Sequence, residues 1–233
     1  AFLLSLLDNS IKTQDDVSQA LALPTLSSIP RFQVKERTSS PVASALPLSP
    51  VSESFRTLRT NLRYAGIGKP LKTLLITSAE PGAGKTTTAS NLGVVCAQAG
   101  LKVILVDADL RRPGLHRPFF LKSVPGLTDL LVNDAEDVQQ CLLDTETPGL
   151  RLVSCGKIPF NPAELLGSQR MRELLTELGD LADLVIVDTP PALMVTDAAV
   201  LAPAADGVLL VISAAKTRRD EARQALERIR QVG

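Results

Sequence analysis

The stretch of the chain with the clearest chemical meaning is a glycine-containing turn that leads into a lysine and three threonines. Residues 74–88 read LLITSAEPGAGKTTT, an apolar run, a turn and the start of a helix. In such a turn, backbone N–H groups and a helix N-terminus surround phosphate oxygens, and glycine lets the backbone approach them. The lysine ammonium reaches the outer phosphates, and the next hydroxyl can ligate Mg²⁺. The residues predicted to bind a nucleotide are Pro81, Gly82, Ala83, Gly84, Lys85, Thr86 and Thr87.

This loop departs from the strict phosphate-loop pattern at one position. The pattern G-x-x-x-x-G-K-[ST] begins with glycine, and this chain has Ala79 there. An ordinary surface loop is the alternative interpretation. The strand-like residues before the turn and the helix-like residues after it favour phosphate binding, because the motif requires that context.

Three aspartates follow apolar runs elsewhere in the chain. Residues 102–113 read KVILVDADLRRP and contain Asp107 and Asp109, and residues 184–191 read LVIVDTPP and contain Asp188. Alternate residues of an extended chain point the same way, so the first two can face one site. Ligands of open α/β sheets bind at the carboxyl ends of the strands. One such aspartate alone commonly caps a turn, whereas three beside a phosphate loop predict a Mg²⁺–nucleotide site.

Holding these groups together requires strands that end at one edge of a sheet. Apolar runs alternate with amphipathic stretches, which predicts an α/β fold with a mostly parallel sheet and helices on both faces. We expect strands near residues 73–78, 102–108, 151–155, 184–188 and 207–213. We expect helices near residues 51–65, 85–99, 127–132, 168–180 and 217–231.

The chain divides into three zones. Residues 1–34 contain the capping box TQDD at 13–16, which predicts a short helix followed by a short extended segment. Residues 35–50 are rich in serine and proline and are predicted to form a flexible linker. The nucleotide-binding domain is predicted over residues 51–233.

Composition limits the classes of function. The chain of 233 residues has a formal net charge of +0, so no basic field argues for nucleic acid. Its single histidine, His116, excludes a histidine-based metal cluster. The cysteines lack C-x-x-C spacing and are expected to be buried small residues; they are Cys96, Cys141 and Cys155. No apolar run approaches the roughly 18 residues that a membrane span needs.

The helix expected at 51–65 has two distinct faces. One face is apolar and is predicted to pack on the domain; it carries Phe55, Leu58 and Leu62. The other carries Glu53, Arg56 and Arg59 at spacings of three residues. That spacing fits either a solvated surface with a weak ion pair or a subunit contact in which arginine binds a partner's carboxylate.

Five segments together resemble the cytoplasmic domain of a bacterial protein-tyrosine kinase (BY-kinase) of exopolysaccharide and capsule biosynthesis. They are SAEPGAGKTT, ILVDADLRRP, VIVDTPP, the E-x-x-R-x-x-R pattern of Glu53, Arg56 and Arg59, and NPAELLGSQRM at 161–171. Residues 6–30 also resemble the juxtamembrane cytoplasmic segment of the form fused to a chain-length-determinant polysaccharide co-polymerase. The resemblance implies a P-loop NTPase fold of the deviant Walker A type, shared with partition and division-site ATPases.

The resemblance also implies a role for each site residue, with ATP and Mg²⁺ as cofactors. The residues assigned to catalysis are Lys85, Asp107 and Asp109. Asp107 would accept the proton of the tyrosine hydroxyl or position that hydroxyl, because solvated tyrosine has a pKa near 10 and needs a base to act as a nucleophile. Thr86, Asp109 and Asp188 would act on Mg²⁺, the aspartates directly or through water.

For the whole protein, the resemblance implies a homo-oligomeric ring joined through Glu53, Arg56 and Arg59, with tyrosine autophosphorylation in trans. The implied partners are the membrane domain of the co-polymerase, a cognate tyrosine phosphatase and the bacterial inner membrane, reached through a flanking segment. The expected location is the cytoplasmic face of that membrane, and the expected process is control of polysaccharide chain length, polymerisation and export.

The chain departs from the family in its tyrosines. It contains one, Tyr64, whereas the family carries a C-terminal tyrosine cluster. Either the domain is C-terminally truncated here or the phosphoacceptors lie elsewhere. Tyr64 itself is predicted to be a packing or surface residue.

Two other functions compete with a kinase. A partition or division-site ATPase would carry a second lysine early in its phosphate loop, and this chain has Glu80 there, which has the opposite charge. A non-catalytic ATP-binding assembly module is the second alternative. The presence of Lys85, Thr86 and all three aspartates argues against it, because a scaffold does not need them.

Overall fold

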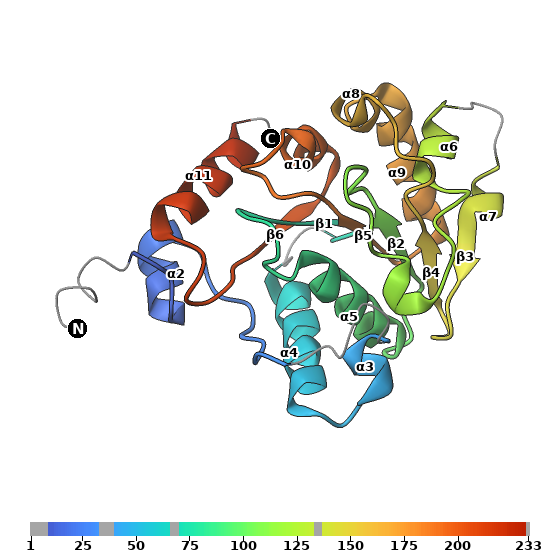
Figure 1. Ribbon diagram of the computed structural model, residues 1–233. Helices are drawn as coiled ribbons and strands as arrows, with labels where there is room; N and C mark the ends of the chain where they lie inside the picture. Colours follow the sequence, from blue (N-terminus) through green and yellow to red (C-terminus); the bar gives the residue numbers. More distant parts are fainter. Residues whose placement is uncertain (1–8, 33–39, 66–69, 133–136, 232–233) are drawn as a thin grey trace.

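The computed structural model of the protein describes residues 9–32, 40–65, 70–132 and 137–231, and its centre is one β-sheet (Figure 1). The six-stranded sheet has the order β3-β4-β2-β5-β1-β6. β3 pairs antiparallel with β4, and the other neighbours pair in parallel. The strands are β1 (Thr73–Ser78), β2 (Val103–Asp107), β3 (Leu142–Asp144), β4 (Leu150–Val153), β5 (Leu184–Asp188) and β6 (Gly207–Val211). The predicted mostly parallel sheet is confirmed.

Helices cover both faces of this sheet, which explains why the three central strands contain continuous apolar runs instead of alternating polar and apolar residues. Every residue of β1, β2 and β5 is buried. A strand with solvent on one face would alternate polar and apolar residues, whereas a strand covered on both faces reads as a continuous apolar run.

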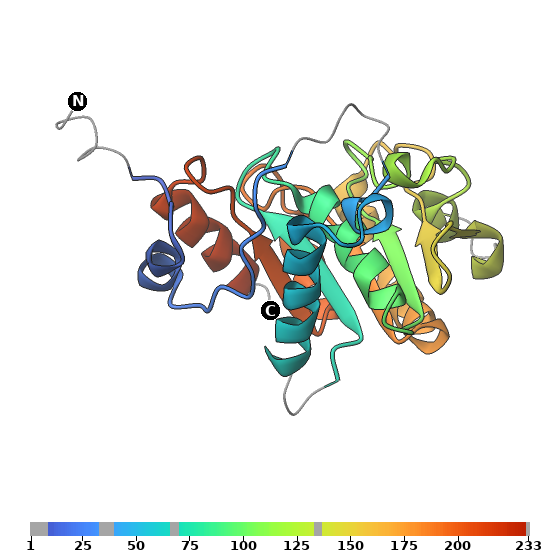
Figure 2. The same cartoon turned by 90° about the horizontal axis from the view of Figure 1, so that it is seen from below.

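One face is covered by α5 (Lys85–Ala97), with α4 (Pro50–Ala65) and α3 (Val42–Ala45) packed outside it (Figure 2). The predicted packing residues of α4 are confirmed: Phe55, Leu58 and Leu62 are 1%, 4% and 8% exposed. α5 lies directly on the sheet. A Cβ atom built on Gly93 would lie 2.9 Å from Cδ2 of Leu105 in β2, so the absence of a side chain there permits this close packing.

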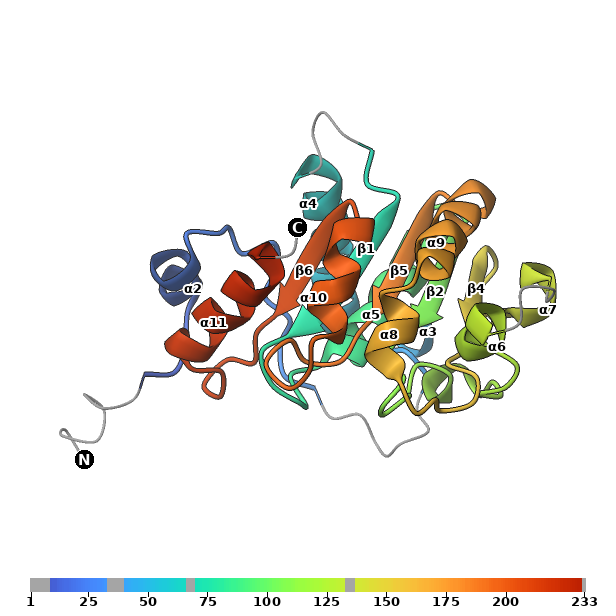
Figure 3. The same ribbon diagram turned by 90° about the horizontal axis from the view of Figure 1, so that it is seen from above.

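The helices that lie on or beside the opposite face come from the second half of the chain (Figure 3). They are α6 (Leu127–Val132), α7 (Val138–Cys141), α8 (Pro162–Leu166), α9 (Gln169–Leu181), α10 (Asp197–Leu201) and α11 (Arg219–Arg230). Two short 3-10 helices, η1 (Arg117–Phe119) and η2 (Ala202–Ala204), lie in the same half of the chain. Among the described helices, none combines the length and apolar character needed to cross a bilayer.

The N-terminal segment folds onto the domain through α2 (Gln14–Leu21), which packs against α11. The predicted capping box is present: the Thr13 hydroxyl accepts a hydrogen bond from the N–H of Asp16, whose carboxylate accepts one from the N–H of Thr13. Ile11 and Leu21 are buried in a small cluster with Ala222 of α11. This segment is therefore anchored to the last helix of the described chain.

Part of the predicted linker at 35–50 is structured, which corrects the expectation of a flexible segment there. Residues 35–39 lie outside the described residues. Val42–Ala45 form α3, whose Ala43 is fully buried, and the N–H of Ala43 donates to the side-chain oxygen of Asn91 in α5. The serine- and proline-rich composition suggested a flexible segment, but its small residues pack tightly on α5.

Several short elements were not predicted from the sequence, namely β3, α7, α8 and α10. Each has five residues or fewer, too short for a hydrophobic period to appear. For α8 a signal existed, because Pro162 occupies its first position, where proline is favoured.

Candidate functional site

The predicted phosphate-binding loop joins the carboxyl end of β1 to the first turn of α5. Gly82 and Gly84 have positive φ angles of 75° and 98°. A Cβ atom built at either position meets nothing within 4 Å, so glycine is needed there for its backbone conformation and not for space. The loop residues 80–84 are partly or fully exposed, and α5 begins at Lys85. The loop therefore presents backbone N–H groups and a helix N-terminus to an incoming anion.

Lys85 and Thr86 follow the loop, and their side chains lie near the carboxylate of Asp188. Lys85 is 7% exposed and lies near enough to Asp188 to favour its ionised form. The Thr86 hydroxyl donates a hydrogen bond of 2.6 Å to Oδ2 of Asp188. Two residues 102 positions apart along the chain are thus joined at the start of α5.

The two buried aspartates lie side by side because β2 and β5 are neighbours in the sheet. Asp107 and Asp188 pair in the parallel register and are 0% and 1% exposed. Burial raises the pKa of Asp107 to about 7, although the N–H groups of Leu115 and Gly114 oppose this by donating to its Oδ2. Burial and the adjacent Asp107 raise the pKa of Asp188 to about 8. Because burial disfavours the ionised form of both carboxylates, a positive charge at this position would be stabilising.

Asp109 lies at the same end of the sheet and is partly exposed. Its charge contributes to the raised pKa values of Asp107 and Asp188, which indicates that the three carboxylates share one region, as predicted. One oxygen of Asp109 accepts a hydrogen bond from the N–H of Arg112. The loop after β2 therefore folds back onto its own two aspartates.

These oxygens fit a small, hard cation. Oδ1 of Asp188 is buried and has no hydrogen-bond partner, and the neighbouring Asp109 is partly exposed. Mg²⁺ prefers oxygen ligands, and it commonly binds to one or two carboxylates while phosphates and water fill its remaining positions. Within the described ranges, no group of three or more His, Cys, Asp or Glu side chains is arranged to hold a metal by itself. This donor set suits Mg²⁺ that arrives with a nucleotide.

Two polar contacts around the site were not foreseen. Glu80 in the phosphate loop accepts a hydrogen bond of 2.7 Å from the hydroxyl of Thr217, which is 1% exposed. Arg111 binds both oxygens of Asp197 in α10 at 3.0 and 3.1 Å, and Asp197 is fully buried. Both join segments far apart in the sequence, so no local pattern could reveal the pairing.

The predicted subunit-contact residues already make contacts within the chain. Arg56 forms a 3.0 Å salt bridge with Glu53 and donates to the carbonyl of Pro47. Arg59 donates to the carbonyl of Val95 near the end of α5. The Glu53 side chain is 68% exposed. Glu53 remains the most available of the three for a partner.

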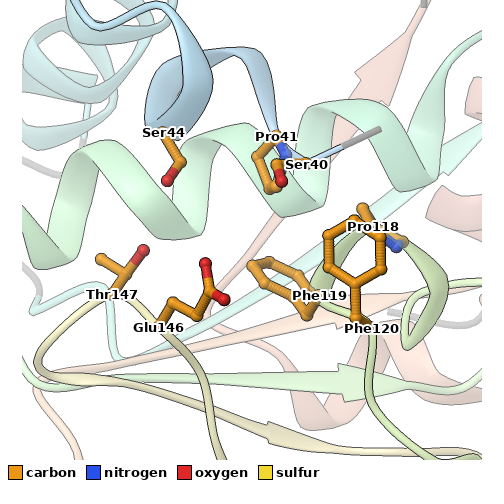
Figure 4. Close-up of a pocket in the computed structure, with 8 residues that line it drawn as sticks. All are labelled: Ser40, Pro41, Ser44, Pro118, Phe119, Phe120, Glu146 and Thr147. Carbon is orange, nitrogen blue, oxygen red and sulfur yellow. The ribbon is translucent and has the colours of Figure 1, made fainter. Parts of the chain in front are cut away.

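Two hollows lie outside the nucleotide site. The cavity in Figure 4 measures about 10 Å³ and lies between α3, Phe119, Phe120 and residues 146–147. That volume is about the smallest that holds one water molecule, so it is not a ligand site. A larger groove of about 500 Å³ lies between the N-terminal segment and α4, where Glu53 and Thr57 line it.

Comparison with known proteins places this geometry in a family. Residues 71–233 match the family described as AAA domain. Tyrosine-protein kinase YwqD of Bacillus subtilis is 47% identical over 186 residues, which cover 80% of this chain and 78% of that protein. Tyrosine-protein kinase ptk of Acinetobacter johnsonii is 34% identical over 100% of this chain but only 33% of its own length, so the chain spans about a third of that relative.

A solved structure agrees with these sequence matches. The kinase domain of the Escherichia coli tyrosine kinase ETK superposes with a TM-score of 0.89 at 32% identity, over 96% of this chain and 90% of that one. The likeness extends over nearly all of both chains.

Proposed function

Since this chain belongs to the bacterial protein-tyrosine kinase (BY-kinase) family, with a P-loop NTPase fold, we propose that ATP with Mg²⁺ is its phosphoryl donor and that the site at the carboxyl ends of β1, β2 and β5 performs the transfer. The observation that carries the proposal is the pair of buried carboxylates, Asp107 and Asp188, beside Thr86 and the phosphate loop. Phosphoryl transfer depends on positioning and charge neutralisation, and this arrangement supplies both.

Each residue has a specific part in this proposal. The N–H groups of the loop and the Lys85 ammonium bind phosphate oxygens. Thr86 and Asp188 would hold the cation, with Asp109 acting on it directly or through water. When bound, Mg²⁺ would neutralise charge on the phosphates. The Thr86–Asp188 hydrogen bond holds the two oxygens that would bind the cation 2.6 Å apart.

Asp107 is the proposed acceptor of the tyrosine proton. Its Oδ2 is occupied by the N–H groups of Gly114 and Leu115, which fixes the carboxylate and leaves Oδ1 for the substrate hydroxyl. Burial raises the pKa of Asp107 to about 7. A general base is most effective when its pKa lies near the working pH, and this value meets that condition.

The division-site type of ATPase is less well supported. Its second lysine would reach from the phosphate loop to a partner's nucleotide. In this chain the corresponding Glu80 is bound to Thr217 of the same chain, and its charge would repel a partner's phosphates. No described contact favours that alternative over the kinase.

We further propose that the kinase regulates exopolysaccharide chain length, polymerisation and export together with a polysaccharide co-polymerase at the cytoplasmic face of the inner membrane. The support is the resemblance of residues 6–30 to the fused form, together with the much greater length of the ptk relative. Residues 1–34 are the proposed juxtamembrane segment and residues 51–233 the proposed kinase domain, and the segment between them includes α3, which packs on α5. Ring assembly and a phosphatase partner belong to the same proposal.

The first experiment compares Lys85→Met with Lys102→Met, a matched change at an exposed lysine before β2. Both chains are incubated with Mg-ATP and a tyrosine-rich acceptor peptide, and phosphotyrosine on the peptide is measured by mass spectrometry. We expect Lys85→Met to lose transfer by roughly 10²-fold or more, since a charge that stabilises the phosphates is removed. Lys102→Met should retain the unmodified rate. Equal rates in the two variants would contradict the proposed site.

A further inference from the structure

The single tyrosine of the chain lies in an unusual position for a packing residue. Tyr64 belongs to the last turn of α4 and is 65% exposed. The buried apolar side chains of this helix, Phe55, Leu58 and Leu62, are only 1% to 8% exposed. The side chain of Tyr64 therefore contributes little to the core, and the alternative of a packing residue is removed.

Tyr64 also lies on a defined face of α4. The exposed residues of the helix that fall into line with it are Glu53, Thr57 and Thr60, at successive spacings of four, three and four residues. Residues at these spacings form one stripe along a helix. The stripe contains Glu53, the most available of the predicted subunit-contact residues, so a contact between two copies through α4 would bring Tyr64 close to the second copy.

From these observations, and resting on the proposed kinase function, we propose that Tyr64 is a phosphoacceptor that a second copy of the chain phosphorylates. It lies in the last helical turn, where the final carbonyl groups lack helical partners, so local opening to an extended substrate conformation is inexpensive.

The position of Tyr64 excludes phosphorylation by its own site. The C-terminal end of α4 lies at the amino end of β1, whereas the phosphate loop follows the carboxyl end of that strand (Figures 2 and 3). The six residues of β1 separate the two ends by about 20 Å at roughly 3.3 Å per residue. A side chain cannot cover that distance, so transfer to Tyr64 must take place between two chains.

The ATP bound to the second copy supplies the phosphoryl group that is transferred to Tyr64. The phenolic oxygen of Tyr64 attacks the γ-phosphorus, and an oxygen–phosphorus bond forms. The bond between that phosphorus and the β,γ-bridging oxygen breaks, and ADP leaves with the bridging oxygen. The phenolic proton passes to a carboxylate at the nucleotide site of the second copy.

The test mixes two variants that cannot label themselves. Isotopically heavy Lys85→Met keeps Tyr64 but lacks the proposed phosphate-binding lysine, and light Tyr64→Phe keeps the site but lacks the acceptor. A heavy Lys85→Met/Tyr64→Phe chain is the matched control, and a tyrosine-rich peptide in the same tube reports kinase activity. Because the chain has a single tyrosine, any phosphotyrosine on the heavy chain is at that residue.

We expect phosphotyrosine on the heavy Lys85→Met chain and none on the heavy double variant, with an initial rate that rises when both proteins are concentrated. Labelled peptide with an unlabelled heavy chain would overturn the inference and leave the kinase function standing. The unmodified protein is incubated separately. If it is labelled but the heavy Lys85→Met chain in the mixture is not, transfer between chains is overturned. If neither peptide nor chain is labelled, the proposed function fails and this inference fails with it.

Discussion

At the scale of single residues, the site is defined by two carboxylates that the fold forces together. Asp107 and Asp188 end neighbouring strands, and burial holds the pKa of both above the ordinary range, while the charge of Asp107 raises the pKa of Asp188 further. The hydrogen bond from Thr86 favours the ionised form of Asp188, but burial outweighs it. In the ligand-free protein, ionisation of these two buried carboxylates lowers the free energy of unfolding. A bound cation would offset that loss of stability.

This arrangement predicts how stability depends on pH in the ligand-free protein. The pKa values of Asp107 and Asp188 rise from 3.8 to about 7 and about 8, so between these limits the folded state holds more protons than the unfolded state. The contribution of these two groups to the free energy of unfolding should therefore be most favourable below pH 4. It should fall as pH rises to about 8, by at most about 1.4 kcal/mol per pH unit for each group.

Urea unfolding at several pH values measures this dependence. Asp188→Asn should reduce the slope between pH 5 and pH 8, and Asp144→Asn, a change at an exposed aspartate in β3, should leave it unchanged. Added Mg-ATP should raise stability most at the high end of the range, where both carboxylates are ionised. A slope identical in the unmodified protein and Asp188→Asn would contradict the assigned protonation.

At the scale of elements, the phosphate loop is tied to the loop before α11. Thr217 donates through its hydroxyl to Glu80, accepts there from the N–H of Ser213, and accepts at its carbonyl from the N–H of Ile11. One buried threonine thus joins the nucleotide loop, the end of the sheet and the N-terminal segment. The relation could not be read from the sequence, because Glu80 and Thr217 are 137 residues apart and neither belongs to a periodic pattern.

Replacing Thr217 tests this junction. Thr217→Val keeps the shape but removes both side-chain hydrogen bonds, which leaves a Glu80 oxygen and the Ser213 N–H without their partners. We expect a loss of about 1–3 kcal/mol in the free energy of unfolding and weaker nucleotide binding. Thr176→Val, at an exposed threonine in α9, is the control, and isothermal titration with Mg-ADP gives the affinity. Unchanged affinity in Thr217→Val would show that the junction does not act on the loop.

Prediction from sequence succeeded for the apolar strands and the longer helices, and it failed for the shortest helices and for β3. The strands that carry the aspartates were found because they are continuous apolar runs buried on both faces. β3 was missed because its three residues, Leu142–Asp144, lie at the sheet edge and are partly or fully exposed. The site residues were found from local motifs, whereas Arg111 and its partner Asp197 depend on a contact that only the folded chain makes.

At the scale of the whole molecule, the N-terminal segment is part of the folded unit. Ile11 is 2% exposed and packs with Leu21 and Ala222, and the N–H of Arg219 donates to the carbonyl of Asn9. The first described residues and the last described helix therefore pack together at the β6 edge of the nucleotide-binding sheet (Figure 3). Loss of a buried side chain from the N-terminal segment should therefore lower the stability of the domain.

Ile11→Ala tests that expectation. Removing the buried side chain should lower the free energy of unfolding by about 2–5 kcal/mol, because packing contacts are lost and a cavity is left. Lys12→Ala, at the exposed neighbouring residue, is the comparison, and chemical unfolding of both variants gives the difference. If Ile11→Ala costs no more than Lys12→Ala, the segment is not an integral part of the fold.

The most direct test of the central claim is to measure both products of the reaction with and without the proposed base, Asp107. Mg-ATP and a tyrosine-rich peptide are given to the unmodified protein and to Asp107→Asn, and ADP and phosphotyrosine are measured together. We predict equal amounts of the two products from the unmodified protein and a loss of both by roughly 10²-fold or more in the variant. ADP without phosphotyrosine from the unmodified protein, or undiminished phosphotyrosine from Asp107→Asn, would contradict a tyrosine kinase that uses this carboxylate.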